Sequence, residues 1–184
     1  MKTSVKTYLT ILSSLLLAAC SGGGGGSDDS FVGAADVSVV TQPSQIDSGD
    51  RTEVSIELSN VHDDGIALKI RVPNALVYVR ASAMLLVGSE EQDLTPTVND
   101  VSSDDDRYIV FYIPQSDFKT SGQDYNGESG TVVLQLEGVD AVTDGLIEVD
   151  PDVDDPQISN DTEFDISNPE FVAQAETSIT VVSD

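Results

Sequence analysis

Apolar and polar residues alternate along most of the chain beyond residue 35. Residues 53–59 and 66–72 place an apolar side chain at every second position, and an Asp-Gly pair at 64–65 lies between them. A period of two is typical of strands with one buried and one solvated face, and Asp-Gly is typical of turns. The same pattern predicts further strands at 37–41, 76–81, 84–87, 107–113, 131–137, 146–149 and 171–182.

Helical periodicity is not sustained anywhere beyond residue 35, and clusters of turn-forming residues recur at short intervals. Many short strands with frequent turns favour a sandwich or a barrel. We therefore predict an all-β fold, a single antiparallel β-sandwich over residues 35–184. Lys69 and Arg71 fall on the polar side of the strand at 66–72. We expect them to point into solvent, where like charges discourage edge-to-edge pairing with another chain.

The first residues have the pattern of a secretory signal. Lys2 and Lys6 precede an apolar run from about Tyr8 to Ala19, which is shorter than the roughly 20 residues that span a bilayer. The run closes with Leu17-Ala18-Ala19-Cys20, which resembles the lipobox of bacterial lipoproteins. That resemblance implies cleavage of residues 1–19 and lipidation of Cys20, which would anchor the protein to a membrane.

A tether follows the predicted lipidation site. Residues 20–34 begin with Cys20 and Ser21, continue with a run of glycines at 22–26 and end in mixed small and acidic residues, a composition typical of a flexible linker. In Gram-negative bacteria an aspartate after the modified cysteine tends to retain lipoproteins in the inner membrane. Ser21 resembles the group sorted to the outer membrane, so we expect an outer-membrane location in such a host.

Composition narrows the possible partners. Lys and Arg number 8 against 33 Asp and Glu, which gives a formal net charge of −25. Nucleic-acid binding draws on Lys and Arg to neutralise phosphates, so this charge argues against it. The chain has one cysteine and therefore no internal disulfide. Strong self-repulsion favours a soluble, monomeric ectodomain.

A second resemblance covers most of residues 37–182. Gly49-Asp50-Arg51 leads into a strand, Val72-Pro73-Asn74-Ala75-Leu76-Val77-Tyr78-Val79 follows, and Ser129-Gly130-Thr131-Val132 comes late. This order resembles the Ig-like conserved-repeat domains of bacterial and archaeal surface proteins, and a cohesin-like sandwich with a similar opening is the rival. Either family implies a β-sandwich used for spacing or adhesion, without catalysis, and the first implies an Ig-like one.

Few residues are candidates for catalysis. His62 is the only histidine, it lies in a predicted turn, and the chain has no Gly-x-Ser-x-Gly sequence around a nucleophile. A hydrolase that uses a pair of carboxylates stays as a remote alternative, because a chain this acidic meets that requirement trivially. The sequence therefore predicts a protein that is not an enzyme.

Calcium binding is a stronger alternative than the carboxylate hydrolase. The acidic segment 150–161 carries Asp150, Asp152, Asp154, Asp155 and Asp161, and Ca²⁺ takes carboxylate oxygens as ligands. The sixth position is Asp155 where an EF-hand has glycine, so an EF-hand is excluded and an irregular calcium loop remains. A solvated acidic surface, suited to high salt, explains the same residues.

These observations predict a lipid-anchored cell-envelope protein with a structural or adhesive sandwich, whose partner is an unidentified envelope protein or surface ligand. A calcium-dependent binding module is the alternative.

Overall fold

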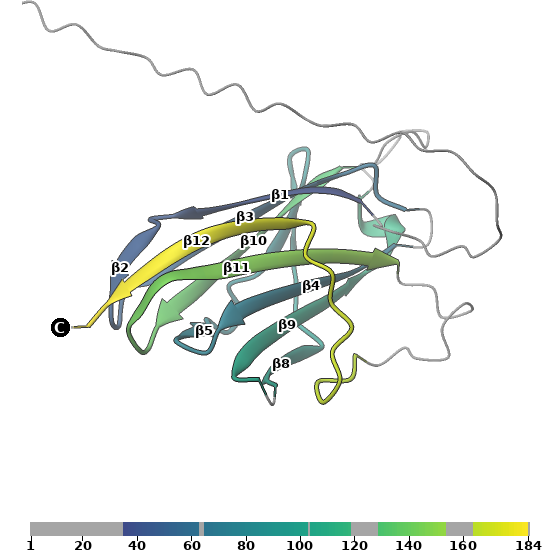
Figure 1. The fold of residues 1–184 in the computed structure, drawn as a ribbon. Coiled ribbons are helices and arrows are strands. Elements are labelled where there is room, and N and C mark those ends of the chain that lie inside the picture. The colour runs from purple at the N-terminus through teal and green to yellow at the C-terminus, as the bar shows by residue number, and fades with distance from the viewer. Residues whose placement is uncertain (1–34, 63–64, 103, 119–128, 154–163, 184) are drawn as a thin grey trace, which may run out of the picture. The chain divides into compact units, whose positions relative to one another are not determined.

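The computed structural model describes residues 35–62, 65–102, 104–118, 129–153 and 164–183, and these form a β-sandwich of two sheets (Figure 1). The prediction of an all-β sandwich is confirmed. The signal peptide, Cys20 and most of the tether lie outside the described residues. Within the described ranges, no helix is long and apolar enough to cross a membrane.

The first sheet is antiparallel. Its strands run in the order β1 (Asp36–Gln42), β3 (Arg51–Ser59), β10 (Gly130–Gly138), β6 (Met84–Val87) and β7 (Glu90–Asp93), and β5 (Leu76–Tyr78) also pairs with β10. Strands β3 and β10 alternate buried and more exposed residues along their length. This is the pattern that their alternating sequence predicts for strands with one face in a core.

The second sheet contains one parallel pair. Its order is β2 (Gln45–Asp47), β12 (Ala175–Val182), β11 (Val142–Val153), β4 (Ile66–Pro73), β9 (Asp106–Ile113) and β8 (Val98–Val101). Strands β2 and β12 run parallel, whereas the other described neighbours run antiparallel. A short 3-10 turn (Gln115–Phe118) follows β9.

The core lies between the two sheets. Its largest fully buried side chains come from both layers and include Ile56 and Leu134 of the first sheet and Leu68, Ile70 and Phe111 of the second. Large apolar side chains such as these each contribute about 1.5–3 kcal/mol when fully buried. Burial of alternate residues from both sheets therefore fixes which face of each strand points inward.

Strand β4 differs from the sequence prediction. It lies in the interior of the second sheet between β11 and β9, so it is not an edge strand. Its residues are buried on both faces as far as Ile70, and Lys69 is buried instead of pointing into solvent.

A connecting segment accounts for part of this burial. Residues 164–174, here named the strap, lead into β12 and appear as the yellow coil in Figure 1. Ring contacts and hydrogen bonds join the strap to β9, β4 and β11 on the side of the sheet that faces away from the core. The strand predicted at 171–182 therefore begins at Ala175, because residues 171–174 belong to the strap.

Candidate functional site

Two neighbouring strands place a lysine directly opposite an aspartate. Lys69 of β4 is the register partner of Asp150 of β11, and Asp152 is the partner of Ala67. Leu68 and Ile70 belong to the core, so by the alternation of a strand Lys69 lies on the outer face. Only 7% of Lys69 and 5% of Asp150 remains exposed to solvent.

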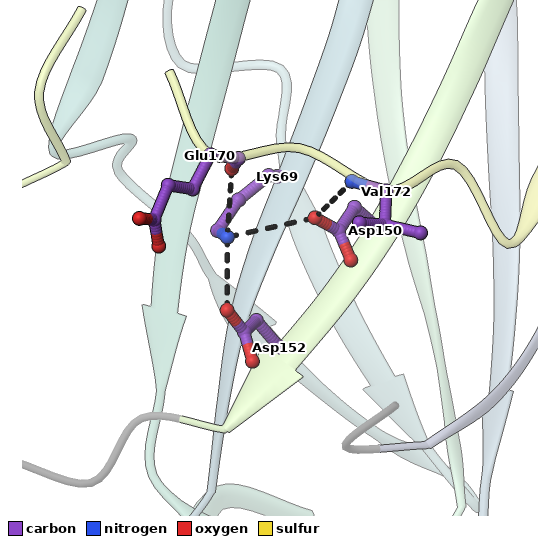
Figure 2. Close-up of polar contacts among 5 residues, drawn as sticks. All are labelled: Lys69, Asp150, Asp152, Glu170 and Val172. Atoms are coloured by element: carbon purple, nitrogen blue, oxygen red, sulfur yellow. Dashed lines mark hydrogen bonds and ion pairs between the residues drawn. The ribbon is translucent and has the colours of Figure 1, made fainter. Parts of the chain in front are cut away.

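The Lys69 ammonium group has three hydrogen-bond partners (Figure 2). Its Nζ donates to Asp152 Oδ2 at 2.9 Å, to the backbone oxygen of Glu170 at 3.0 Å and to Asp150 Oδ2 at 3.5 Å. An ammonium group has three N–H donors, so these partners match its full donor capacity. Glu170 belongs to the strap, so the strap covers the Lys69 ammonium group on the face of the sheet that points away from the core.

Asp150 lies in an unusual environment for a carboxyl group. Its Oδ2 accepts a hydrogen bond of 2.9 Å from the backbone N–H of Val172, also in the strap. Burial raises the pKa of Asp150 above its ordinary value, and the Val172 hydrogen bond and the Lys69 charge oppose this shift only in part. The group therefore favours its neutral acid form more than an exposed aspartate does.

A second charged cluster lies next to the first on the same two strands. Arg71 Nη2 lies 2.6 Å from Glu148 Oε2. The guanidinium carbon of Arg71 also lies 4.8 Å from the ring centroid of Phe171, and that ring packs edge-on against Tyr108. The strap is thus held to the sheet by a polar cluster at Lys69 and by an aromatic cluster at Arg71.

The structure brings together two of the predicted calcium ligands. Asp150 and Asp152 lie on strand β11, not in a loop, and both are hydrogen-bonded to Lys69. Asp154, Asp155 and Asp161 lie outside the described residues, as does Cys20. Among the residues that the structure describes, no group of three or more His, Cys, Asp or Glu side chains is arranged to hold a metal ion. Calcium binding by the segment 150–161 stays an alternative hypothesis.

Lys69 is the residue of this site that the sequence analysis assigned wrongly. Ala67 occupies the outward position before it, and residues 66–70 are apolar apart from Lys69. A nearly continuous apolar run is typical of a strand covered on both faces. That run was the signal that Lys69 would be buried and would need a charged partner.

Another pair of carboxylates lies at a hollow of about 660 Å³ in the first sheet, lined in part by Asp36, Ser38 and Glu57. Asn60 Nδ2 donates to Asp36 Oδ2 at 2.5 Å, and Ser38 Oγ donates to Glu57 Oε2 at 3.4 Å. Both carboxylates are therefore already engaged by neighbouring polar side chains.

Comparisons with known proteins find similar chains among solved structures. No family model matches the chain, and no curated protein matches it by sequence. Among solved structures, AvmM, which catalyses macrocyclization in alchivemycin A biosynthesis, is similar with a TM-score of 0.45 and 12% identity, covering 80% of this chain and 88% of that chain. A non-cellulosomal cohesin from Archaeoglobus fulgidus is similar with a TM-score of 0.39 and 16% identity, over 81% of this chain and 93% of that chain.

Cohesin modules recur among these neighbours. A type I cohesin–dockerin complex from Clostridium thermocellum gives a TM-score of 0.33 and 16% identity, over 82% of this chain and 95% of that chain. Cohesin modules are thus among the structural neighbours of this chain. These likenesses all have TM-scores below 0.5, and none assigns an activity or a partner to this chain.

Proposed function

We propose that this protein is a lipid-anchored component of a cell envelope whose β-sandwich has a structural or adhesive role and no catalytic one. The observation that carries the proposal is the order of Leu17-Ala18-Ala19-Cys20, a glycine-rich tether and a sandwich whose first strand begins at Asp36. A lipidated cysteine would fix the domain at a membrane, and the tether would let it move above that surface.

The charge of the domain supports a position away from the lipid. The chain carries a net charge of −25, and all four residues of β7 (Glu90–Asp93) are exposed. Anionic lipid headgroups repel such a surface, whereas a cationic patch on another envelope component attracts it. We therefore propose a positively charged envelope protein or surface ligand as the partner.

Metabolic labelling with a radioactive fatty acid tests the anchor in the full chain. We expect label in the protein and recovery in the membrane fraction, and we expect the Cys20→Ser variant to lose both. Ser21→Ala is the matched control, because it changes the neighbouring residue and keeps the thiol. A Cys20→Ser protein that is processed and membrane-bound like the parent would refute the proposal.

The proposed outer-membrane location has its own test. In a Gram-negative host, Ser21→Asp should move the labelled protein from the outer-membrane to the inner-membrane fraction without changing the amount of lipid label. Equal distribution of the two proteins between the fractions would contradict the role given to Ser21.

A further inference from the structure

We propose that Lys69 and Asp150 are joined by an intramolecular amide bond, an isopeptide cross-link between β4 and β11, whose formation is assisted by Asp152. The three groups form one cluster, with both aspartate carboxylates on the same Nζ (Figure 2). This site goes beyond the proposed function, because it concerns covalent chemistry within the sandwich and does not depend on the lipid anchor.

Register brings the two reacting groups together. Lys69 and Asp150 are directly opposite on adjacent antiparallel strands, and Nζ lies 3.5 Å from Asp150 Oδ2. Residues directly opposite each other on one face of two antiparallel strands have Cβ atoms only about 4.5–5.5 Å apart. An amide between the two side chains therefore needs a small side-chain movement and no shift of the backbone.

Burial favours the neutral acid form of Asp150, which is the form that reacts. Removing a carboxylate from water is costly even when it is paired, and taking up a proton reduces that cost. The raised pKa of Asp150 has the same cause and the same direction. An amine is a nucleophile and a carboxylic acid is an electrophile, whereas their charged forms are neither.

The strap polarises the group that is attacked. The Val172 N–H donates to Asp150 Oδ2 at 2.9 Å. A fixed backbone donor on this oxygen stabilises the negative charge that develops there when the nitrogen adds to the carboxyl carbon. The strap thus supplies a donor that the sheet alone lacks.

Asp152 is placed to carry the proton. Its Oδ2 lies 2.9 Å from Lys69 Nζ, and its side chain is 45% exposed, so solvent reaches the carboxylate. A positioned carboxylate that takes a proton from a reacting nitrogen is a general base. Asp150 is buried and lies directly opposite Lys69, whereas Asp152 is partly exposed and lies diagonally to it. We therefore assign Asp150 as the acyl group and Asp152 as the base.

The step balances without an oxidant or other reagent. The Nζ lone pair attacks Cγ of the protonated Asp150, a C–N bond forms and a C–O bond breaks. Asp152 accepts a proton from the nitrogen and returns it to the departing hydroxyl, which leaves as water. The ammonium and carboxylate of the starting pair become one neutral amide plus one water molecule.

Peptide mapping of the purified full chain tests the bond directly. Trypsin cuts after Lys and Arg, and no such residue follows Lys119. An acylated Lys69 resists cleavage, so we expect peptide 52–71 joined to peptide 120–184, at the mass of both less one water. Dehydration of an aspartate to a succinimide removes the same mass but joins no peptides and leaves the Lys69 site cleavable.

Variants separate the roles of the three side chains. Lys69→Arg and Asp150→Ala should abolish the joined peptide, and Asp152→Asn should slow its formation by at least about a hundredfold, which is the lower range for general-base catalysis. Glu148→Gln is the matched control, since it removes a carboxylate from the same face of β11 and should leave the joined peptide unchanged.

The wild-type protein decides the question even if a variant fails to fold. The folded protein is incubated for a prolonged time at mildly acidic and at neutral pH before digestion. Recovery of peptides 52–69 and 120–184 only as separate species would overturn the proposal. A joined peptide that persists in Asp150→Ala would overturn the assignment of Asp150 as the acyl group.

Discussion

Replacing Phe171 by alanine should loosen the strap without unfolding the sandwich. The Phe171 ring packs edge-on against Tyr108 with the ring centroids 5.8 Å apart, and Arg71 lies 4.8 Å from its centroid. Such an aromatic pair contributes about 0.5–1.5 kcal/mol and a partly exposed cation–π contact about 0.5–1 kcal/mol. Together the two contacts stabilise the closed strap by roughly 1–2.5 kcal/mol.

Amide hydrogen exchange at Gln174 measures that stability. Its N–H donates to the Val149 carbonyl at 2.9 Å, so exchange requires the end of the strap to open. Each 1.4 kcal/mol corresponds to a factor of ten, so exchange in Phe171→Ala should be about 5- to 60-fold faster. Val172→Ala is the control on the same segment. Val172 is 67% exposed, so this replacement should change the exchange rate by no more than about twofold.

Two results would refute this reasoning. An unchanged Gln174 rate in Phe171→Ala would mean that the ring does not hold the strap. Equal acceleration of amides at the centre of β4 would mean that strap and sandwich open together and that the strap is not a separate unit.

Three further predictions concern the backbone, the pH dependence and calcium. Gly49 and Gly65 share a φ of +91°, but only at Gly65 would an added Cβ meet the Ile113 carbonyl oxygen, at 2.7 Å. In urea melts, Gly49→Ala should lower the free energy of unfolding by about 1–2 kcal/mol, and Gly65→Ala should lower it clearly more. Equal losses in the two variants would contradict this prediction. Burial raises the pKa of Asp106 above 3.8 despite its ion pair with arginine. Its contribution to stability is therefore fully present below pH 3.8 and is lost as the pH rises through the folded-state pKa. As the pH rises from 3.8 through the folded-state pKa, the stability of Asp106→Asn relative to the parent protein should therefore increase. Melts at several pH values measure this difference, and a relative stability that falls with rising pH would contradict the prediction. For the acidic segment 150–161, where a lysine ammonium already bonds two carboxylates, calcium should raise Tm no more than magnesium at equal ionic strength, and a calcium-specific rise would favour the binding-module alternative.

Local alternation was enough to predict the strands with one buried face. Strands β3 and β10 are examples, because each contributes every second side chain to the core. Strand β7 (Glu90–Asp93) could not be found in this way, since its four residues are exposed and acidic or amide-bearing. It is a strand because its backbone pairs with β6, a contact that leaves no apolar pattern in its sequence.

The site was harder to predict than the fold. The acidic residues around Asp150 stood out in the sequence, but their proximity to Lys69 depends on the pairing of β4 with β11, between residues 81 positions apart. Periodicity gives the face of each side chain within one strand and does not give which strands are neighbours. The burial of Lys69 depends on the strap as well, and only residues 171–174 of the strap were predicted, as the start of the last strand.

The parallel pairing of β2 with β12 has a mechanical consequence. The chain enters the sandwich through β1 and β2 and leaves it through β12, and β2 and β12 are hydrogen-bonded side by side in the same direction. Tension applied between the two ends of the domain would load this pair in shear, so its hydrogen bonds would share the force and break together. Terminal strands arranged as a hairpin would instead peel apart one bond at a time, at a lower force.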